Sequence, residues 1–382
     1  MKEIFNSTGL ICDCPGVNIF LQLLSRAILV NVKRFLFYSL ISLAVLIFTL
    51  VFYLGVRAGT RPFRDKPNAI AVLQPLNLGG MEQWILIRGE DASNPILLWL
   101  HGGPGSPQMP MAHHFDAELE KYFVVVHWDQ RGAGKSNPRG FDEETMTFEQ
   151  FLSDAHELTQ YLQQRLGKEK IYLLGHSWGT HLGLQLISKH PGDYYAYIGV
   201  SQVVDNVRAV EVAYTWLEGE MIRHDDEAGL EKLVEIGYPP YTHAQYRQFA
   251  PLVDDYGGSF DWPFWRLTLI GLQAREYTVI DYPRMLNGMT RGGKPLHQGG
   301  EMLRVNFIEE VPKIDVPVFF LHGALDYNTP LVLVEEYFQL LDAPYKELVT
   351  FENAAHTPFL ADTDAFNQVV IRARDIVEGN DQ

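Results

Sequence analysis

The sequence is poor in cysteine and in positive charge, and both deficits narrow what the protein can be. Its 382 residues include only two cysteines, Cys12 and Cys14, both close to the N-terminus. A disulfide framework and a thiolate zinc site are therefore excluded for the rest of the chain. The formal net charge is −16, with 31 Lys and Arg against 47 Asp and Glu. Nucleic acid is excluded as a partner, because a phosphate backbone requires a basic face.

Charge of either sign is missing from one long stretch near the N-terminus. Phe35–Val56 reads FLFYSLISLAVLIFTLVFYLGV and contains no charged residue. At about 1.5 Å per residue, a helix of this length crosses a hydrocarbon core of roughly 30 Å. We expect a single-pass membrane anchor here. A cleaved signal peptide is the competing interpretation, but its apolar region would be unusually long and would start late.

The segments on either side of this stretch are assigned from composition. Residues 1–34 form an N-terminal segment, in which the moderately apolar Val17–Val32 is expected to lie along the membrane surface. Residues 57–71 form a linker. Cations flank the stretch on both sides, so the positive-inside rule leaves its orientation open. These cations are Lys33, Arg34, Arg57, Arg61 and Arg64.

After the linker, short apolar runs alternate with helical segments, which predicts an α/β fold with a mostly parallel sheet covered on both faces. Residues 207–310 break the alternation, because they show helical periodicity, many aromatics and no convincing strand. Such an insertion is expected to cover the carboxyl end of the sheet as a cap. The core then comprises residues 72–206 and 311–382. The expected strands are Val72–Leu78, Glu82–Ile87, Ile96–Leu100, Phe123–Trp128, Ile171–Leu174, Ile198–Val200, Val318–Leu321 and Leu348–Phe351.

Two helix starts are predicted from their capping residues. Thr147 followed by Gln150 predicts a capping box that opens a helix running to about Leu166. Thr329-Pro330 predicts an N-cap and a first-turn proline for a helix that ends near Leu341.

The strand Ile171–Leu174 leads directly into Gly175-His176-Ser177-Trp178-Gly179, and a helical stretch follows. A Gly-x-Ser-x-Gly pattern between a strand and a helix predicts a nucleophile elbow, in which flanking glycines relieve the crowding around a strained serine. The helix dipole at this position favours developing negative charge. Ser177 is therefore the candidate nucleophile.

A serine nucleophile needs a base and an acid that orients it. In this class of fold the acid and then the histidine follow the serine along the chain. Asp326 follows the strand Val318–Leu321, and His356 follows the strand Leu348–Phe351. Two consecutive strand ends can bring both side chains to Ser177. We expect Ser177, Asp326 and His356 to form a catalytic triad.

The oxyanion hole requires two backbone N–H groups beside the serine. Trp178, the residue after the nucleophile, is expected to supply one of them. The loop His101-Gly102-Gly103-Pro104-Gly105 is expected to supply the other, from Gly103 in the first place and Gly102 in the second. Gly134-Lys135-Ser136 superficially suggests a phosphate loop, but Asp129 stands where a Walker A motif needs glycine.

Together, the motifs HGGPG (101–105), WDQRGAGKS (128–136) and GHSWG (175–179) resemble those of the prolyl iminopeptidase family of α/β hydrolases. The resemblance covers roughly residues 73–380. It implies a capped catalytic domain, no metal or other cofactor, and release of an N-terminal residue, typically proline, from short peptides. By motif, Ser177, Asp326 and His356 match the triad of the family, and Gly103 and Trp178 match its oxyanion donors. Asp129 and Arg131 would brace the HGGPG loop.

The sequence departs from this family in its membrane segment and in its amine-binding residues. Exopeptidases of the family hold the free amine of the substrate with cap carboxylates, for which Glu276 and Glu220 are the candidates here. The expected substrate is a small peptide. A carboxylesterase or acyltransferase acting on small acyl substrates is the alternative, and a non-catalytic binding module is the rival from another class.

Overall fold

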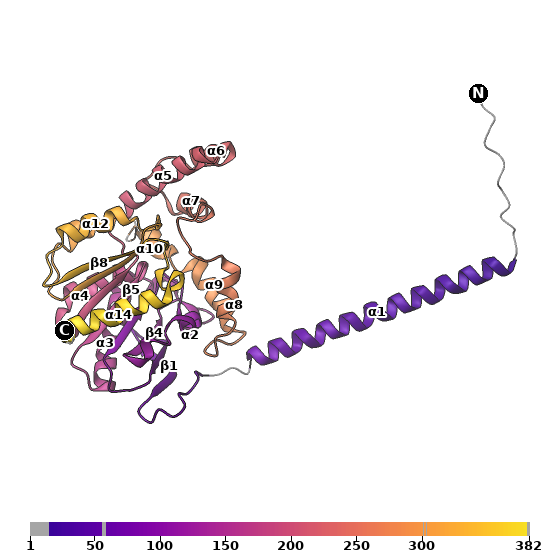
Figure 1. The fold of residues 1–382 in the computed structure, drawn as a ribbon, viewed down its shortest axis with the longest axis horizontal. Coiled ribbons are helices and arrows are strands. Elements are labelled where there is room, and N and C mark those ends of the chain that lie inside the picture. Colours follow the sequence, from indigo (N-terminus) through magenta and orange to yellow (C-terminus); the bar gives the residue numbers. More distant parts are fainter. Residues whose placement is uncertain (1–14, 56–58, 301, 303, 380–382) are drawn as a thin grey trace. The chain divides into compact units, whose positions relative to one another are not determined.

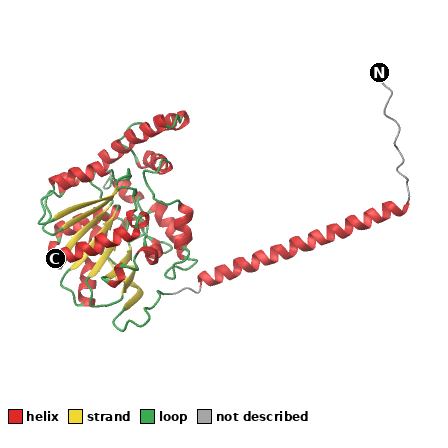
Figure 2. Ribbon diagram, in the orientation of Figure 1, coloured by secondary structure: helices red, strands yellow, loops and turns green. Residues whose placement is uncertain are grey.

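The computed structural model describes residues 15–55, 59–300, 302 and 304–379. The chain divides into two compact units, Met1–Val56 and Arg57–Gln382, and each is described by itself. Figures 1 and 2 show a single helix in the first unit and a layered α/β arrangement in the second.

The first unit contains the helix α1 (Pro15–Gly55), which is 41 residues long. Its stretch Ile28–Phe52 has a mean hydropathy of 2.5, and none of its side chains is buried. At about 1.5 Å per residue this stretch is roughly 38 Å long, which is enough to span a membrane. A signal sequence would satisfy the same criterion. The expected surface segment Val17–Val32 is not separate, because α1 continues through it, and Val56 lies outside the described residues.

The second unit is built on one eight-stranded sheet with the order β1-β2-β4-β3-β5-β6-β7-β8. The pairs β1–β2 and β2–β4 are antiparallel, and every other pair is parallel. The predicted α/β fold with a mostly parallel sheet is confirmed. The strands are β1 (Ile70–Leu78), β2 (Met81–Gly89), β3 (Ile96–Leu100), β4 (Val124–Asp129), β5 (Ile171–His176), β6 (Tyr194–Val200), β7 (Val318–Gly323) and β8 (Lys346–Phe351).

Helices cover both faces of the sheet. Alternate residues of the central strands point to opposite sides, so both faces carry apolar side chains that must be covered. Leu98 packs on the face covered by α3 (Phe148–Leu166), α4 (Trp178–Lys189) and α12 (Leu331–Leu340). Trp99 packs on the opposite face, which is covered by α2 (Ala112–Phe115), α13 (Pro358–Ala361) and α14 (Thr363–Glu378). Short 3-10 turns complete the loops: η1 (Met109–Met111), η2 (Leu119–Lys121), η3 (Gly134–Ser136), η4 (Glu143–Thr145) and η5 (Pro191–Asp193).

Both predicted helix starts differ in detail from the structure. Thr147 caps α3 by accepting a hydrogen bond from the Gln150 backbone N–H at 3.2 Å. The Gln150 side chain donates to Asp154 instead, so only half of the capping box forms. The N-cap of α12 is Pro330, not Thr329. The Thr329 hydroxyl instead donates to the Asp326 carboxylate at 2.7 Å.

A run of helices connects β6 to β7. The first three, α5, α6 and α7, bury a small core of their own around Leu217, Leu233 and Phe249. Of the remaining four, α10 and α11 bury Leu296 and Phe307 in the core on one face of the sheet. The helices are α5 (Asn206–Arg223), α6 (Glu227–Ile236), α7 (His243–Asp255), α8 (Phe264–Gly271), α9 (Asp281–Arg291), α10 (Lys294–Gly299) and α11 (Phe307–Glu310).

Candidate active site

Ser177 occupies a sharp turn between β5, which ends at His176, and α4, which begins at Trp178. Its φ of 54° and ψ of −120° are unusual for a residue with a side chain and cost about 1–3 kcal/mol. The residues two positions before and after Ser177 must be glycines, because a side chain there would clash with nearby backbone. A β-carbon on Gly175 would lie 2.4 Å from the Gly179 carbonyl oxygen, and one on Gly179 would lie 2.1 Å from that of Leu100.

The two other candidate triad residues are in direct contact. His356 Nδ1 donates to Asp326 Oδ2 at 2.8 Å, and both side chains are buried. Asp326 also accepts hydrogen bonds from the backbone N–H groups of Asn328 and Thr329 and from the Thr329 hydroxyl. Burial alone would raise the pKa of Asp326, but the charge and hydrogen bond of His356 and these further donors hold it well below its usual range. Asp326 is therefore ionised at neutral pH.

Two other histidines near the site have structural roles. Burial lowers the pKa of His176 to about 3, so its ring is neutral. Its Nε2 lies 2.8 Å from the His356 carbonyl oxygen, and its Nδ1 lies 2.6 Å from Gln108 Nε2. His322 is fully buried and contacts the Thr329 carbonyl oxygen through Nε2 at 2.6 Å. Both rings thus brace the loops that hold the acid and the base.

Gln130 ties the HGGPG loop to the nucleophile turn. Its backbone N–H donates to His101 Nε2 at 3.1 Å, and its side-chain amide donates to the His101 carbonyl oxygen at 3.0 Å. Its side-chain oxygen accepts from the Trp178 indole N–H at 3.0 Å. The HGGPG loop closely approaches the serine, since a β-carbon on Gly102 would lie 3.2 Å from that of Ser177. The sequence analysis did not identify Gln130, although it lies inside the WDQRGAGKS motif.

The contacts of Asp129 and Arg131 differ from the expected bracing of the HGGPG loop. Arg131 forms a buried ion pair with Asp154 at 2.9 Å and donates to the Gly79 carbonyl oxygen at 3.0 Å, so it joins α3 to the β1–β2 hairpin. Asp129 accepts from the Lys135 backbone N–H and from the Tyr277 hydroxyl. Burial raises the pKa of Asp129 to about 7. Gln130, which stands between them, contacts the loop instead.

The segment just before α8 holds the loop of the candidate base. The Asp261 carboxylate accepts hydrogen bonds from the backbone N–H groups of Ala355 at 2.6 Å and Thr357 at 2.7 Å, the two neighbours of His356. It also accepts from the Thr357 hydroxyl at 2.7 Å. The His356 backbone N–H donates to the Ser259 carbonyl oxygen at 2.9 Å. No motif marks Asp261, so the sequence analysis missed it.

The two candidate amine-binding carboxylates have different surroundings. Glu220 forms an ion pair with Arg223 at 2.7 Å and lies 3.8 Å from His224. Glu276, between α8 and α9, is 6% exposed and makes no hydrogen bond or ion pair with any residue that the structure describes. Its charge acts on His113 in α2, because it raises the pKa of that ring against the larger lowering by burial. Glu276 is therefore the carboxylate that is free for a ligand.

A family model for the alpha/beta hydrolase family matches residues 97–369, which contain the whole of this constellation. The chain belongs to the α/β-hydrolase family. A probable aminopeptidase of Bacillus subtilis is 36% identical to this hydrolase over 316 residues, covering 80% of this chain and 96% of that protein. A proline iminopeptidase of Lactobacillus helveticus is 23% identical over 311 residues, covering 75% and 92%.

The fold of this hydrolase is shared with solved structures. The crystal structure of a proline iminopeptidase from Mycobacterium smegmatis matches it with a TM-score of 0.58 at 19% identity, covering 81% of this chain and all of that one. The hydrolase thus has aminopeptidase and proline iminopeptidase homologues along most of its length.

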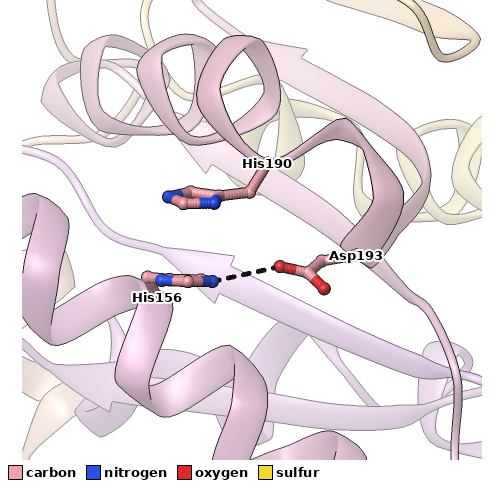
Figure 3. Close-up of side chains that lie close together, drawn as sticks. All are labelled: His156, His190 and Asp193. Carbon is pink, nitrogen blue, oxygen red and sulfur yellow. Dashed lines mark hydrogen bonds and ion pairs between the residues drawn. The ribbon is translucent and has the colours of Figure 1, made fainter.

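A second histidine–aspartate cluster lies at the other end of α4 and is drawn in Figure 3. His156 of α3 lies parallel to His190, with ring centroids 3.7 Å apart, and its Nε2 is 3.2 Å from Asp193 Oδ2. One donor atom from each of the three residues lies within 4.8 Å of the others, so the cluster is a candidate metal-binding group. Stacked rings direct their lone pairs along parallel lines, so a shared ion would require one ring to turn.

Proposed function

We propose that this hydrolase is a serine hydrolase that works through an acyl-enzyme, with Ser177 as nucleophile, His356 as base and Asp326 as the orienting acid. The hydrogen bond between His356 and the ionised Asp326 is the observation that carries the proposal, and the His356 carbonyl oxygen lies 2.8 Å from Nε2 of His176, the residue before the strained Ser177. A buried carboxylate on Nδ1 leaves the Nε2 of the imidazole free to take a proton from the serine.

In the proposed reaction, each step is carried out by one of these residues. His356 takes the proton of the Ser177 hydroxyl as its oxygen attacks the substrate carbonyl carbon. The Trp178 and Gly103 N–H groups donate to the resulting oxyanion. His356 returns the proton to the leaving amine, the acyl-enzyme forms, and water attacks it with His356 again acting as base. Asp326 holds the imidazole in one tautomer throughout.

The proposed substrate is a short peptide with a free N-terminus, from which the enzyme releases the first residue. The names of the relatives support an aminopeptidase. Glu276 supports recognition of a charged amine, because its carboxylate has no partner among the described residues and its oxygens are not fully buried, so its charge is available to a ligand. The ion pair of Glu220 makes it the second candidate. We propose that residues 207–310 act as the cap and that α1 anchors the enzyme in a membrane.

The proposal is tested by activity profiling of the purified chain on aminoacyl naphthylamides and short-chain nitrophenyl esters. Ser177→Ala should abolish turnover and fluorophosphonate labelling. Glu276→Gln should raise the KM for free-amine substrates about tenfold or more and leave ester hydrolysis unchanged; Glu220→Gln tests the second candidate, and Glu235→Gln, at an exposed glutamate, is the matched control. An enzyme that turns over esters but ignores every aminoacyl amide would contradict the peptidase assignment.

A carboxylesterase or acyltransferase is the second candidate, and one observation favours it. A small pocket beside the acid loop is lined by Val210, Ala213, Tyr246, Phe249, Val253 and Tyr327, without a charged side chain. The lining suits an apolar group, but its volume of about 10 Å³ holds only one water, so an acyl chain would enter only if the surrounding helices moved apart. Ester turnover that rises with acyl-chain length, combined with no effect of Glu276→Gln on any substrate, would favour this alternative.

A further inference from the structure

The helix α8 exposes apolar side chains on one side. Phe264, Trp265 and Leu269 are 60%, 64% and 54% exposed, and helical spacing places Trp265 and Leu269, four residues apart, on the same side. The other side is packed, since Ile270 is buried and Leu267 contacts the buried cluster on one face of the sheet. The helix therefore cannot turn its exposed side inward without losing its existing packing.

The neighbouring helix α9 also carries exposed apolar side chains. Ile280, Leu286 and Met289 are also exposed, and the Tyr282 hydroxyl joins α9 to the end of α8 by donating to the Gly271 carbonyl oxygen at 2.9 Å. We call the six exposed apolar residues Phe264, Trp265, Leu269, Ile280, Leu286 and Met289 the α8–α9 face. Apolar surface of this kind, rimmed by charge, marks interaction sites for proteins or membranes.

Within residues 264–294 the exposed charges are cations, of which Arg291 pairs with Glu143 at 2.8 Å and Arg284 pairs with Asp281 at 3.5 Å. Both acidic residues between positions 264 and 294, Glu276 and Asp281, are buried. The cations of the same stretch are exposed or half-buried, in a protein whose net charge is −16. An anionic surface is therefore attracted to this face, whereas the rest of the acidic protein repels it. The cations are Arg266, Arg275, Arg284, Arg291 and Lys294.

The N-terminal end of the catalytic unit is fixed near the same place. Arg88 of β2 donates to the Thr60 hydroxyl and to the Arg61 carbonyl oxygen, both at 2.6 Å. The charges of Arg61 and Glu276 both act on His113, so both lie close to α2. Thr60 is five residues from Gly55, the last residue of α1, and an extended chain spans at most about 3.6 Å per residue. A bilayer holding α1 is thus within about 18 Å of Thr60.

We propose that the α8–α9 face and its cations rest on the anionic lipid surface of the bilayer that α1 spans. The inference rests on the proposed membrane anchor. Aromatic and aliphatic side chains with basic neighbours are the residues that bind the interface of anionic bilayers. Because α8 begins three residues after Asp261, the docked face adjoins the segment that holds the His356 loop.

Tryptophan fluorescence can test this in the full chain. None of the seven tryptophans precedes Trp84, so the fluorescence reports only on the catalytic unit. The chain is placed in nanodiscs of phosphatidylcholine and phosphatidylglycerol, with and without brominated acyl chains. Bromine quenches only indoles at the lipid surface. We expect clear quenching in the wild type and at least a twofold smaller quenched fraction in Trp265→Phe, while Trp216→Phe keeps the wild-type value.

A separate double variant tests the contribution of the cations. Arg275→Gln with Lys294→Gln should reduce quenching in discs with phosphatidylglycerol, and high salt should do the same to the wild type. Fluorophosphonate labelling checks that each variant is folded, and co-flotation with liposomes checks the anchor. Co-flotation and labelling without quenching, or equal quenching in Trp265→Phe and the wild type, would overturn the docking proposal alone. Loss of co-flotation would overturn the anchor and the docking together, and loss of labelling would overturn the serine chemistry.

Discussion

The two ends of α4 carry the same kinds of residue in different surroundings. At its N-terminal end, His356 and Asp326 are 2.8 Å apart, with side chains 6% and 0% exposed. At its C-terminal end, His156 and Asp193 are 3.2 Å apart and about a quarter exposed. In the first pair, the His356 carbonyl oxygen contacts His176, the residue before the strained Ser177, and Asp326 accepts four hydrogen bonds. A histidine–aspartate contact is thus no catalytic site in itself, and we propose that burial and a neighbouring nucleophile give the first pair its chemical use.

The largest predicted difference between the two pairs is in turnover. Asp326→Asn removes the charge that holds the His356 tautomer, so kcat should fall by a factor on the order of 10⁴. Asp193→Asn is the matched control and should leave kcat unchanged. Steady-state kinetics measures both, with circular dichroism to verify the fold. Equal losses in the two variants would show that the buried pair has no special role.

A smaller effect is expected from the residue that supports the buried pair. Asp261→Ala removes three hydrogen bonds from the loop around His356 without touching the imidazole. A misplaced base costs about 10²-fold, so we expect kcat to fall by that amount with little change in KM. Asp255→Ala, an exposed aspartate at the end of α7, is the control. A change in KM alone would contradict a positioning role.

Burial also determines the pH at which a histidine takes up a proton, and therefore how the stability of the fold changes in acid. His181 packs against Phe148, Trp178 and Phe307, and burial lowers its pKa to about 3. The unfolded chain takes up a proton near pH 6.5 and the folded one only near pH 3, so stability is lost as the pH falls through this window. His181→Phe should reduce the loss of unfolding free energy between pH 7 and pH 5 by about 2 kcal/mol. Urea unfolding at both pH values measures it, and an unchanged difference would refute the assignment.

The smallest effect is expected at the exposed pair. His156→Ala removes a half-exposed contact with Asp193 and one ring of the stack with His190. Exposed ion pairs contribute little, so the unfolding free energy should change by about 0.5 kcal/mol or less. Urea unfolding at pH 7 checks this. A loss several times larger would mean that the surface cluster supports the fold as the buried one does.

The strands and most of the candidate site could be predicted because their signals are local. The core strands are short apolar runs, and Ser177 lies in a five-residue pattern between a strand and a helix. Asp326 and His356 follow two successive strands that pair in parallel, so their strand ends meet at one edge of the sheet. The role of Thr329 was mistaken, because its hydroxyl can cap a helix or bind an acid, and the sequence does not choose between them.

Other features required the folded chain. Asp261 holds the His356 loop across a separation of 94 and 96 residues, and Gln130 reaches His101 and Trp178 from a third loop. The half-formed capping box of α3 has the same origin, because Asp154 draws the Gln150 side chain away. Such contacts depend on which loops meet in space, and composition and periodicity do not encode that directly.

The sequence by itself determined the apolar N-terminal helix and the α/β class, and it predicted the order of the candidate nucleophile, acid and base. These follow from hydrophobic runs and from short motifs whose geometry is local. Only the tertiary structure decided which candidate carboxylate has no partner among the described residues, which residues brace Asp326 and His356, and which helices keep apolar side chains in solvent. Burial and side-chain contacts depend on residues that lie far apart in the chain, so they arise only when the chain has folded.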